Sequence, residues 1–287
     1  MSRRAIKCPA WIPILAAMIL AVAAPRGFGD SDQTIPATPD KAARDVGKFT
    51  FVRIEYDSTG GMDEAYYYYD GRLWQRWQTD YPEADENFLL RLSQLTTIDV
   101  NPKPITMRLT DPRLFQYPFI YMSDVGWQEL SPREEERLRE YLLRGGFLWI
   151  DDFWGDAEWN NWEYNMRQVF PDLEWREIPH DHPILNIVFP LGECPQIPAR
   201  DFAFQRPGVN WDQPFIHRGR SNDENQVNQV HFRGLFSKSG RLMAVATHNT
   251  DIGDGWEREA EDERYFRVYS VRAYALGINV ISYIMSH

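Results

Sequence analysis

The sequence has 287 residues, 43% of them hydrophobic and 25% charged, with a net charge of −11. This balance is that of a globular protein, and the length is enough for one large α/β domain that folds without disulfide bonds or a structural metal. The negative charge excludes nucleic acid as a partner, because contacts with phosphate dominate nucleic-acid affinity.

The first 24 residues have the pattern of a cleavable signal peptide. Arg3, Arg4 and Lys7 precede an apolar stretch at residues 11–24, which is shorter than the roughly 20 residues needed to span a bilayer. Small residues at 21–23 fit a cleavage site. We therefore expect export to the periplasm or out of the cell, with an uncleaved N-terminal anchor as the alternative.

Residues 25–47 contain three prolines and predict a flexible linker ahead of a single α/β domain at residues 48–287. Without residues 1–24 the chain has 28 basic and 42 acidic residues, a net charge of −14. One cysteine, Cys194, then remains, so no disulfide can form within the chain. A bacterial periplasm, which is oxidising but does not require disulfides, fits this composition.

Strand and helix patterns alternate after the linker. Residues 49–54 predict a strand, and apolar residues at helical spacing over 88–95 predict a helix capped by Asp85. Two further short strands are predicted at residues 105–109 and 119–122. This alternation is typical of α/β proteins.

The clearest unit of the chain is a strand, a helix and a second strand. Ser131 and Glu134 form a capping box at the start of the helix, and a pair of glycines at 145–146 ends it. The apolar run at 147–150 does not alternate, which indicates a strand buried on both faces. Together with the strand at 119–122, these elements predict a parallel crossover.

The remaining elements complete the predicted domain. Residues 242–247 predict another buried strand, and Asp156 is the expected cap of a helix that follows the strand at 147–150. Residues 268–285 predict an amphipathic closing helix, which Arg272 and Asn279 exclude as a membrane span. The whole pattern predicts a doubly wound, mostly parallel α/β sheet.

Polar residues follow three of the predicted strands. Ligands of doubly wound sheets bind beyond the carboxyl ends of the strands, where paired carboxylates could share a proton, hold a metal or bind a polyol. Asp and Asn are also favoured in turns and helix caps, which is the structural alternative. The candidate catalytic residues are Asp151, Asp152, His248 and Asp251, and the candidate binding residues are Asp124, Asn249 and Asp254.

Two other segments are candidates for binding. His180 and His182 could bind a metal together with His248 or Asp151, although their proline-bordered loop is equally compatible with a simple turn. No cofactor is required by the sequence, and a divalent metal is compatible with it. Trp77 and Asp80 lie in an aromatic segment whose flat rings beside carboxylates could bind a sugar; packing of a loop is the alternative.

Several segments, in order, carry a resemblance to a known family. They are residues 51–56, 77–82, 117–121, 142–148, 151–153, 181–184 and 248–257. The chain resembles domain-of-unknown-function family 4159 of bacterial envelope proteins over nearly its whole predicted domain. The resemblance implies a fold similar to the class I glutamine amidotransferases, which is flavodoxin-like, and it implies no known reaction.

The amidotransferases place a nucleophilic cysteine directly after a central strand. Residues 151–153 correspond to that place here, and the carboxylates of Asp151 and Asp152 cannot form a thioester. Cys194 lies in a loop beside a proline, so glutaminase activity is not expected. The missing nucleophile favours a non-catalytic domain that binds an envelope protein, glycan or peptide. The alternative is a hydrolase of an envelope glycan or peptide that uses the carboxylate and histidine cluster, with or without a metal.

Export can be tested directly. We expect mass spectrometry of the mature protein to show a new N-terminus between Ala24 and Asp30, because signal peptides are cleaved after small residues. A chain that keeps Met1 in the envelope fraction would show instead that the segment is an anchor.

Overall fold

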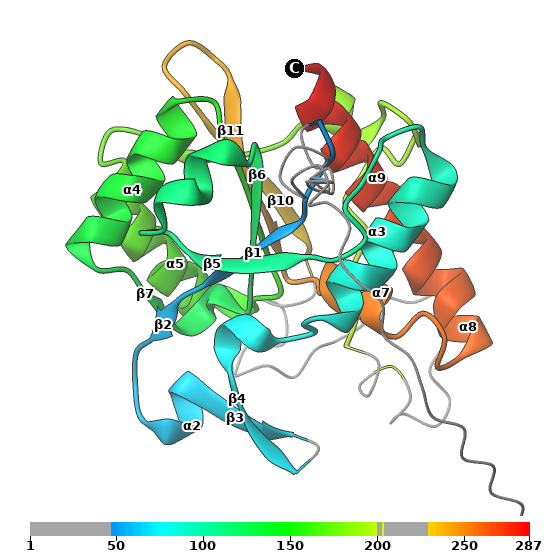
Figure 1. Ribbon diagram of the computed structural model, residues 1–287, viewed down its shortest axis with the longest axis horizontal. Helices are drawn as coiled ribbons and strands as arrows, with labels where there is room; N and C mark the ends of the chain where they lie inside the picture. Colours follow the sequence, from blue (N-terminus) through cyan, green and yellow to red (C-terminus); the bar gives the residue numbers. More distant parts are fainter. Residues whose placement is uncertain (1–46, 70, 200–202, 204–228) are drawn as a thin grey trace, which may run out of the picture. The chain divides into compact units, whose positions relative to one another are not determined.

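The computed structural model describes residues 47–69, 71–199, 203 and 229–287. The predicted signal peptide and nearly all of the predicted linker lie outside these residues. A seven-stranded sheet with the order β5-β1-β6-β8-β11-β10-β9 forms the centre (Figure 1). The neighbouring strands β5, β1, β6, β8 and β11 are parallel to one another. Strand β10 is antiparallel to β11, and β9 is antiparallel to β10. The predicted doubly wound, mostly parallel α/β sheet is therefore confirmed.

The strands follow the apolar runs of the sequence. The first strand is shorter than predicted, because Phe49 only forms an isolated bridge with Val100. Two small antiparallel pairs lie outside the main sheet, and the β3–β4 hairpin extends away from it (Figure 1). The strands are β1 (Val52–Glu55), β2 (Asp57–Ser58), β3 (Tyr66–Tyr69), β4 (Arg72–Gln75), β5 (Ile105–Arg108), β6 (Phe119–Ser123), β7 (Gln128–Glu129), β8 (Phe147–Asp151), β9 (Trp175–Glu177), β10 (His231–Phe236) and β11 (Leu242–His248).

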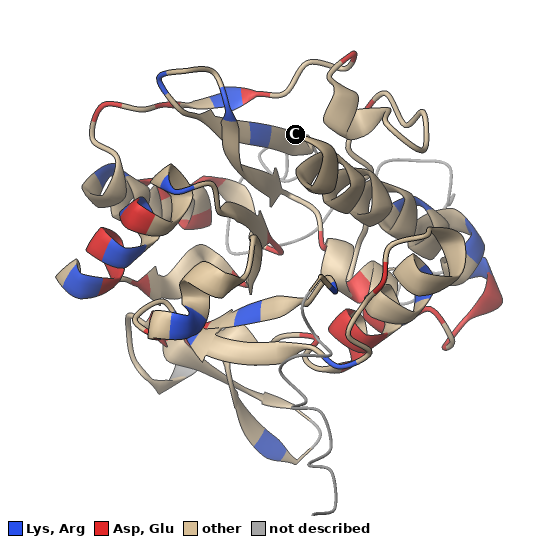
Figure 2. Cartoon of the chain, turned by 45° about the horizontal axis from the view of Figure 1, so that its top comes forward, with Lys and Arg blue, Asp and Glu red and all other residues tan. Residues whose placement is uncertain are grey.

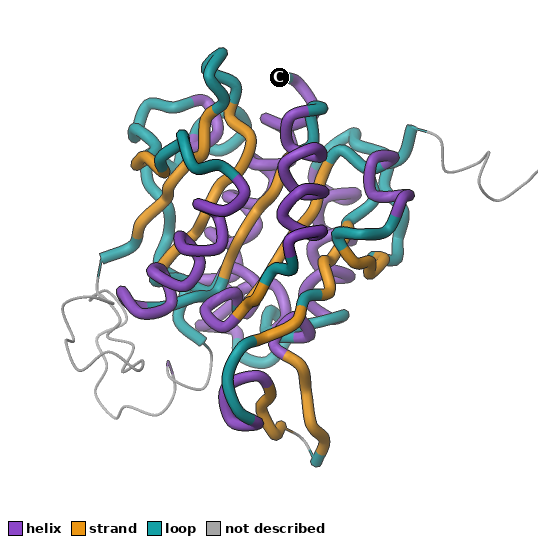
Figure 3. Tube along the Cα trace, turned by 90° about the vertical axis from the view of Figure 1, so that its left-hand side faces the viewer, coloured by secondary structure: helices purple, strands orange, loops and turns teal. Residues whose placement is uncertain are grey.

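Helices cover both faces of the sheet (Figures 1 and 3). One face packs against α3 (Glu83–Leu95), α7 (Ile252–Glu257) and α9 (Val271–Ser286), and the other against α4 (Pro132–Leu143) and α5 (Gly155–Val169). Among the described residues, no helix has both the length and the apolar character that a membrane crossing requires. The short helical turns are α2 (Met62–Ala65), η1 (Arg76–Gln78), η2 (Pro112–Gln116), η3 (Val125–Trp127), η4 (Pro183–Leu185), α8 (Glu263–Tyr265) and η5 (Phe266–Ser270).

Strand β8 shows how the two cores arise. Phe147 and Trp149 point into the core under α3, α7 and α9, while Leu148 and Ile150 point into the core under α4 and α5. All four side chains are buried, and each such side chain contributes about 1.5–3 kcal/mol. Figure 2 shows that the charged residues lie mainly on helices, turns and strand ends. The polar strand ends are therefore the places where chemistry can occur.

Two of the three predicted helix caps are wrong. Ser131 does cap α4, and Glu134 completes the capping box. However, Pro82 is the N-cap of α3, and Trp154 is the N-cap of α5, with Asp156 exposed in the first turn. Asp85 is unavailable as a cap because its carboxylate is used inside the protein.

The partner of Asp85 is Arg53, on the neighbouring strand β1. Both side chains are fully buried, and the guanidinium donates from Nε to Oδ2 over 3.2 Å and from Nη2 to Oδ1. Its Nη1 donates to the backbone oxygen of Thr79 over 3.0 Å, and its Cζ lies 4.8 Å from the ring centre of Tyr121. Arg53 thus joins β1 to α3 and to the residue that precedes Asp80.

The buried pair predicts a large loss of stability when one partner is removed. Asp85→Ala leaves the Arg53 charge buried without an anion, and we expect a cost of about 3–5 kcal/mol. Glu86→Ala is the matched control, because it removes only the exposed pair with Lys103 and should cost less than about 1 kcal/mol. Urea unfolding measures both, and equal losses would contradict this role of the buried pair.

Candidate functional site

A cavity of about 320 Å³ lies at the carboxyl ends of β6 and β8. Its walls come from the β3–β4 hairpin, the segment between η1 and α3, the turns after β6 and β8, and the helix α7 with the turn before it. Ligands of doubly wound sheets bind at this edge. A cavity therefore lies at the edge of the sheet where the sequence predicted that polar residues collect.

The backbone at this edge has an unusual conformation. Asp124, Asp152 and Asn249 directly follow β6, β8 and β11 and have φ angles of 53°, 55° and 62°. Asp80 has a φ of 62°, and the described part of the chain has no other non-glycine residue with positive φ. Such residues are uncommon, and they concentrate at functional sites. Three neighbouring strands therefore end in the same kind of turn.

Three carboxylates converge in the cavity. Asp80, Asp152 and Asp251 each offer an oxygen, and these oxygens lie within 4.8 Å of one another. The Oδ2 atom of Asp80 is buried and accepts no hydrogen bond from the described residues. Gly253 makes room for it, because a Cβ atom there would lie 2.5 Å from Oδ2.

Arginines neutralise other acids of the cavity but leave these three unpaired. Arg76 pairs with Asp124 over 3.0 Å. Arg258 pairs with Asp254 over 3.2 Å and with Glu257 over 2.7 Å. None of Asp80, Asp152 and Asp251 forms an ion pair within the described chain, and the buried Arg53 offsets only part of the charge of Asp80.

Burial raises the pKa of each unpaired carboxyl group well above its ordinary value. Nearby carboxylates raise these pKa values further: Glu257 and Asp254 act on Asp80, and Asp152 acts on Asp251. In the absence of a cation, each of these groups therefore binds a proton more readily than an exposed carboxyl group does.

Asp151 does not line the cavity, but its hydrogen bonds hold elements that form the cavity in place. It is fully buried and accepts hydrogen bonds from the Tyr121 hydroxyl over 2.7 Å, from the Thr247 hydroxyl over 2.5 Å and from the Gly253 amide over 2.9 Å. Burial raises its pKa to about 6. Asp151 therefore connects β6, β8 and β11 to the start of α7.

His248 also lies outside the cavity. Its ring packs 4.8 Å from the ring of Phe153 and 5.4 Å from that of Trp159, and its Nε2 lies 3.1 Å from the backbone oxygen of Gly155. Burial lowers its pKa to about 3, so the neutral ring donates to that oxygen. Asn249 holds the same glycine, since its Oδ1 accepts from the Gly155 amide over 2.8 Å. Both residues position the start of α5.

The other two predicted histidines are not brought to the cavity. His180 Nδ1 lies 2.6 Å from the backbone oxygen of Gly192, and His182 caps η4 by accepting from the Ile184 amide. In the part of the chain that the structure describes, the groups that could hold a metal contain only carboxylates. Cys194 is half-buried beside the core, and burial raises the pKa of its thiol.

The predicted residues Asp124, Asp254 and Asp80 line the cavity, whereas Trp77 is buried in the core. Sequence reasoning missed Glu257, although it follows Asp254 by three residues on α7 and so lies on the same helical face. It also missed further lining residues that come from η1, from the starts of α3 and α5, and from the end of α7. These are Arg76, Tyr81, Trp154, Glu158 and Arg258.

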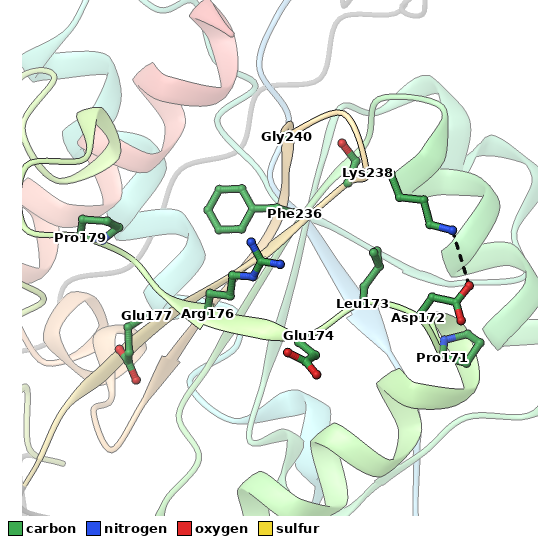
Figure 4. Close-up of a pocket in the computed structure, with 11 residues that line it drawn as sticks. Pro171, Asp172, Leu173, Glu174, Arg176, Glu177, Pro179, Phe236, Lys238 and Gly240 are labelled. Carbon is green, nitrogen blue, oxygen red and sulfur yellow. Dashed lines mark ion pairs between the residues drawn. The ribbon is translucent and has the colours of Figure 1, made fainter.

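A larger hollow of about 880 Å³ lies beside the edge strand β9 (Figure 4). Its charged side chains are those of Asp172, Glu174, Arg176, Glu177 and Lys238. Lys238 lies 3.5 Å from Asp172, and Glu177 binds two residues outside the lining, His231 and Arg233. Charged residues of this kind protect a sheet edge from unwanted pairing. The smaller cavity, where the carboxylates of Asp80, Asp152 and Asp251 converge, is the candidate functional site.

The chain matches the family described as a domain of unknown function (DUF4159) over residues 51–285. The match includes all the residues that line the cavity. No curated protein matches the chain.

The buried acids predict that, in a chelator, stability falls as the pH rises from 6.5 to 8. Glu257, whose pKa is raised from 4.5 to about 8 mainly by burial, binds its proton more tightly in the folded than in the unfolded protein. The free energy of unfolding therefore decreases as this proton is lost, by about 2 kcal/mol over this range at about 1.4 kcal/mol per pH unit. Urea unfolding at each pH measures this decrease.

Below pH 6.5 the buried His248 has the opposite effect, because its lowered pKa makes the unfolded chain bind the extra proton. The test therefore belongs above that pH. Glu257→Gln is expected to flatten the profile, and a stability that increases between pH 6.5 and 8 would contradict the raised pKa values.

Proposed function

This chain belongs to the DUF4159 family, and we propose that it is a binding domain that takes a small polar ligand through a divalent cation held by Asp80, Asp152 and Asp251. The convergence of these three unpaired carboxylates, one of them with a buried oxygen that accepts no hydrogen bond, carries the proposal. We place the domain outside the cytoplasm, in accordance with its N-terminal pattern.

Calcium fits the spacing of the oxygens. It takes oxygen ligands at about 2.3–2.6 Å, so two ligands on opposite sides of one ion are about 5 Å apart. The three oxygens lie within 4.8 Å of one another, which is compatible with that arrangement. Sites in extracellular calcium modules have a Kd of about 10⁻⁴–10⁻³ M, and we expect a value in this range.

Neighbouring groups hold the three ligands in place. The Trp154 indole donates to Asp152 Oδ1 over 2.9 Å, and the Asp254 amide donates to Asp251 Oδ1 over 2.7 Å. Asp80 is held through the preceding residue, whose carbonyl accepts from the buried Arg53. The hydrogen bonds to Asp152 and Asp251 leave the second oxygen of each for a cation, and all three contacts reduce the entropy lost on binding.

Hydrolysis is the second candidate, and the position of Asp152 favours it. Asp152 sits in a left-handed turn directly after the central strand β8 and before α5, which is where the resemblance to amidotransferases would place a nucleophile. A carboxyl group whose pKa is raised, as burial raises that of Asp152, is suited to general acid catalysis. His248 lies outside the cavity, so this candidate depends on carboxyl groups alone. Turnover of a glycan or peptide that is lost in Asp152→Asn would support it.

Asp152→Asn tests the cation site. We expect calorimetry to show calcium binding to the wild-type protein and at least a tenfold weaker affinity in the variant, because one charged ligand is removed. Asp156→Asn, an exposed carboxylate nearby on α5, is the control and should bind calcium normally.

The same variant separates a lost ligand from a lost fold. In chelator, Asp152→Asn should be at least as stable as the wild-type protein, since it removes one of three mutually repelling groups. In calcium, the wild-type protein should gain stability and the variant should not. Unchanged calcium affinity in the variant, or no calcium binding by the wild-type protein, would refute the proposed site.

A further inference from the structure

We infer that the ligand bound beside the cation is a neutral, hydroxyl-rich molecule of the sugar or polyol class. The inference rests on the proposed function and adds the chemical class of its ligand. It depends on two properties of the cavity: the balance of charge that remains once a cation is bound, and an aromatic wall on one side.

The balance of charge disfavours anionic ligands. The two arginines of the cavity, Arg76 and Arg258, already contact carboxylates, so neither is available as the main partner of a phosphate or carboxylate. A divalent cation would offset most of the charge of the three unpaired aspartates. The seven acidic side chains of the lining would still repel an anion.

A cationic ligand is disfavoured for a different reason. An amine would compete with the divalent cation for the same three carboxylates. A neutral polyol has no such conflict, because its hydroxyl oxygens can coordinate calcium while its hydroxyl hydrogens donate to carboxylates. Asp124 and Asp254 both line the cavity, and each carboxylate can accept a further hydrogen bond in addition to its arginine pair. The site therefore supplies partners for both ends of a hydroxyl group.

The aromatic wall comes from the β3–β4 hairpin. Side chains alternate between the two faces of β3, so Tyr67 and Tyr69 line the cavity and Tyr68 does not. Trp74 of β4 also lines it. The rings of Tyr67 and Trp74 are parallel within 8°, with centroids 6.4 Å apart. Tyr69 is 46% exposed, so a ligand in the cavity can contact its ring.

This combination matches the amphipathic surface of a sugar. A sugar ring has C–H groups on its faces and hydroxyl groups around its rim, so it can pack on an aromatic ring and reach carboxylates and a cation at the same time. The volume of about 320 Å³ is at the small end of the range for ligand pockets. The cavity therefore suits one or two sugar rings rather than a long polymer.

Tyr69→Ala and Tyr68→Ala form a matched pair of variants. They are neighbours on one strand, both are exposed, and only Tyr69 lines the cavity. The probes are mannose, galactose, N-acetylglucosamine and maltose at millimolar concentration with calcium, with binding followed by calorimetry. We expect at least one sugar to bind the wild-type protein and the Tyr68→Ala variant equally. We expect about tenfold weaker sugar binding in Tyr69→Ala, the size of one aromatic contact.

Calcium binding separates the two proposals. Tyr69→Ala should keep wild-type calcium affinity, whereas Asp152→Asn should lose both calcium and sugar. If calcium binds and none of the four sugars does, or if inorganic phosphate or spermidine binds in their place, the sugar inference is wrong and the cation site stands. Equal loss of sugar binding in both tyrosine variants, or sugar binding that needs no calcium, would also overturn the inference. Absence of calcium binding would overturn the proposed function itself.

Discussion

The fully buried carboxylate of Asp151 is the constraint on which the candidate site depends. It sits at the end of the central strand β8 and accepts hydrogen bonds from hydroxyl groups of Tyr121 on β6 and Thr247 on β11, and from the amide of Gly253 on α7. An isolated buried charge is costly, and three converging donors offset much of that cost. The same bonds fix the start of α7, and with it Asp251 and the space that Gly253 leaves for Asp80.

Around Asp151, most of the buried acidic side chains form an ion pair with an arginine, and three do not. Asp85 has Arg53, Asp124 has Arg76, and the acids of α7 share Arg258. Within the described chain, no arginine forms an ion pair with Asp80, Asp152 or Asp251. Unpaired charge of this kind lowers stability and is retained where function requires it. The distribution of ion pairs in the domain thus identifies the same three residues as the geometry of the cavity does.

The hairpin contributes a surface that the sheet alone does not provide. Its four consecutive tyrosines at 66–69 alternate between two faces, as in any strand, so adjacent and chemically identical residues have different surroundings. A two-stranded hairpin is marginally stable by itself. Here Arg76 connects it to the domain, since its guanidinium donates to Asp124 and to the backbone oxygen of Glu64 and lies 5.6 Å from the ring of Tyr67. The residue that neutralises one acid of the cavity therefore also holds the aromatic wall.

Local patterns in the sequence were sufficient for the fold class, although they did not predict the antiparallel strands β10 and β9. The apolar runs of β6, β8 and β11, the capping box at Ser131 and the glycines after α4 depend on neighbours within a few residues. They predicted a parallel sheet and the edge at which polar residues collect. Asp85 shows the limit of such patterns. Local spacing predicted that its carboxylate caps a helix, but the carboxylate binds Arg53, which lies 32 positions away in the chain.

Which strand-end residues form the site was decided by the tertiary structure. Asp151 and Asp152 are adjacent, but the first continues the strand into the core, while the left-handed turn at the second directs it into the cavity. His248 ends the next strand and packs among aromatic rings. Asp80 comes from a segment outside the main sheet and reaches the cavity because Arg53 holds the residue before it and Gly253 leaves space. Composition and periodicity report how polar a position is, but the direction of a side chain depends on backbone angles and on partners far away in the chain.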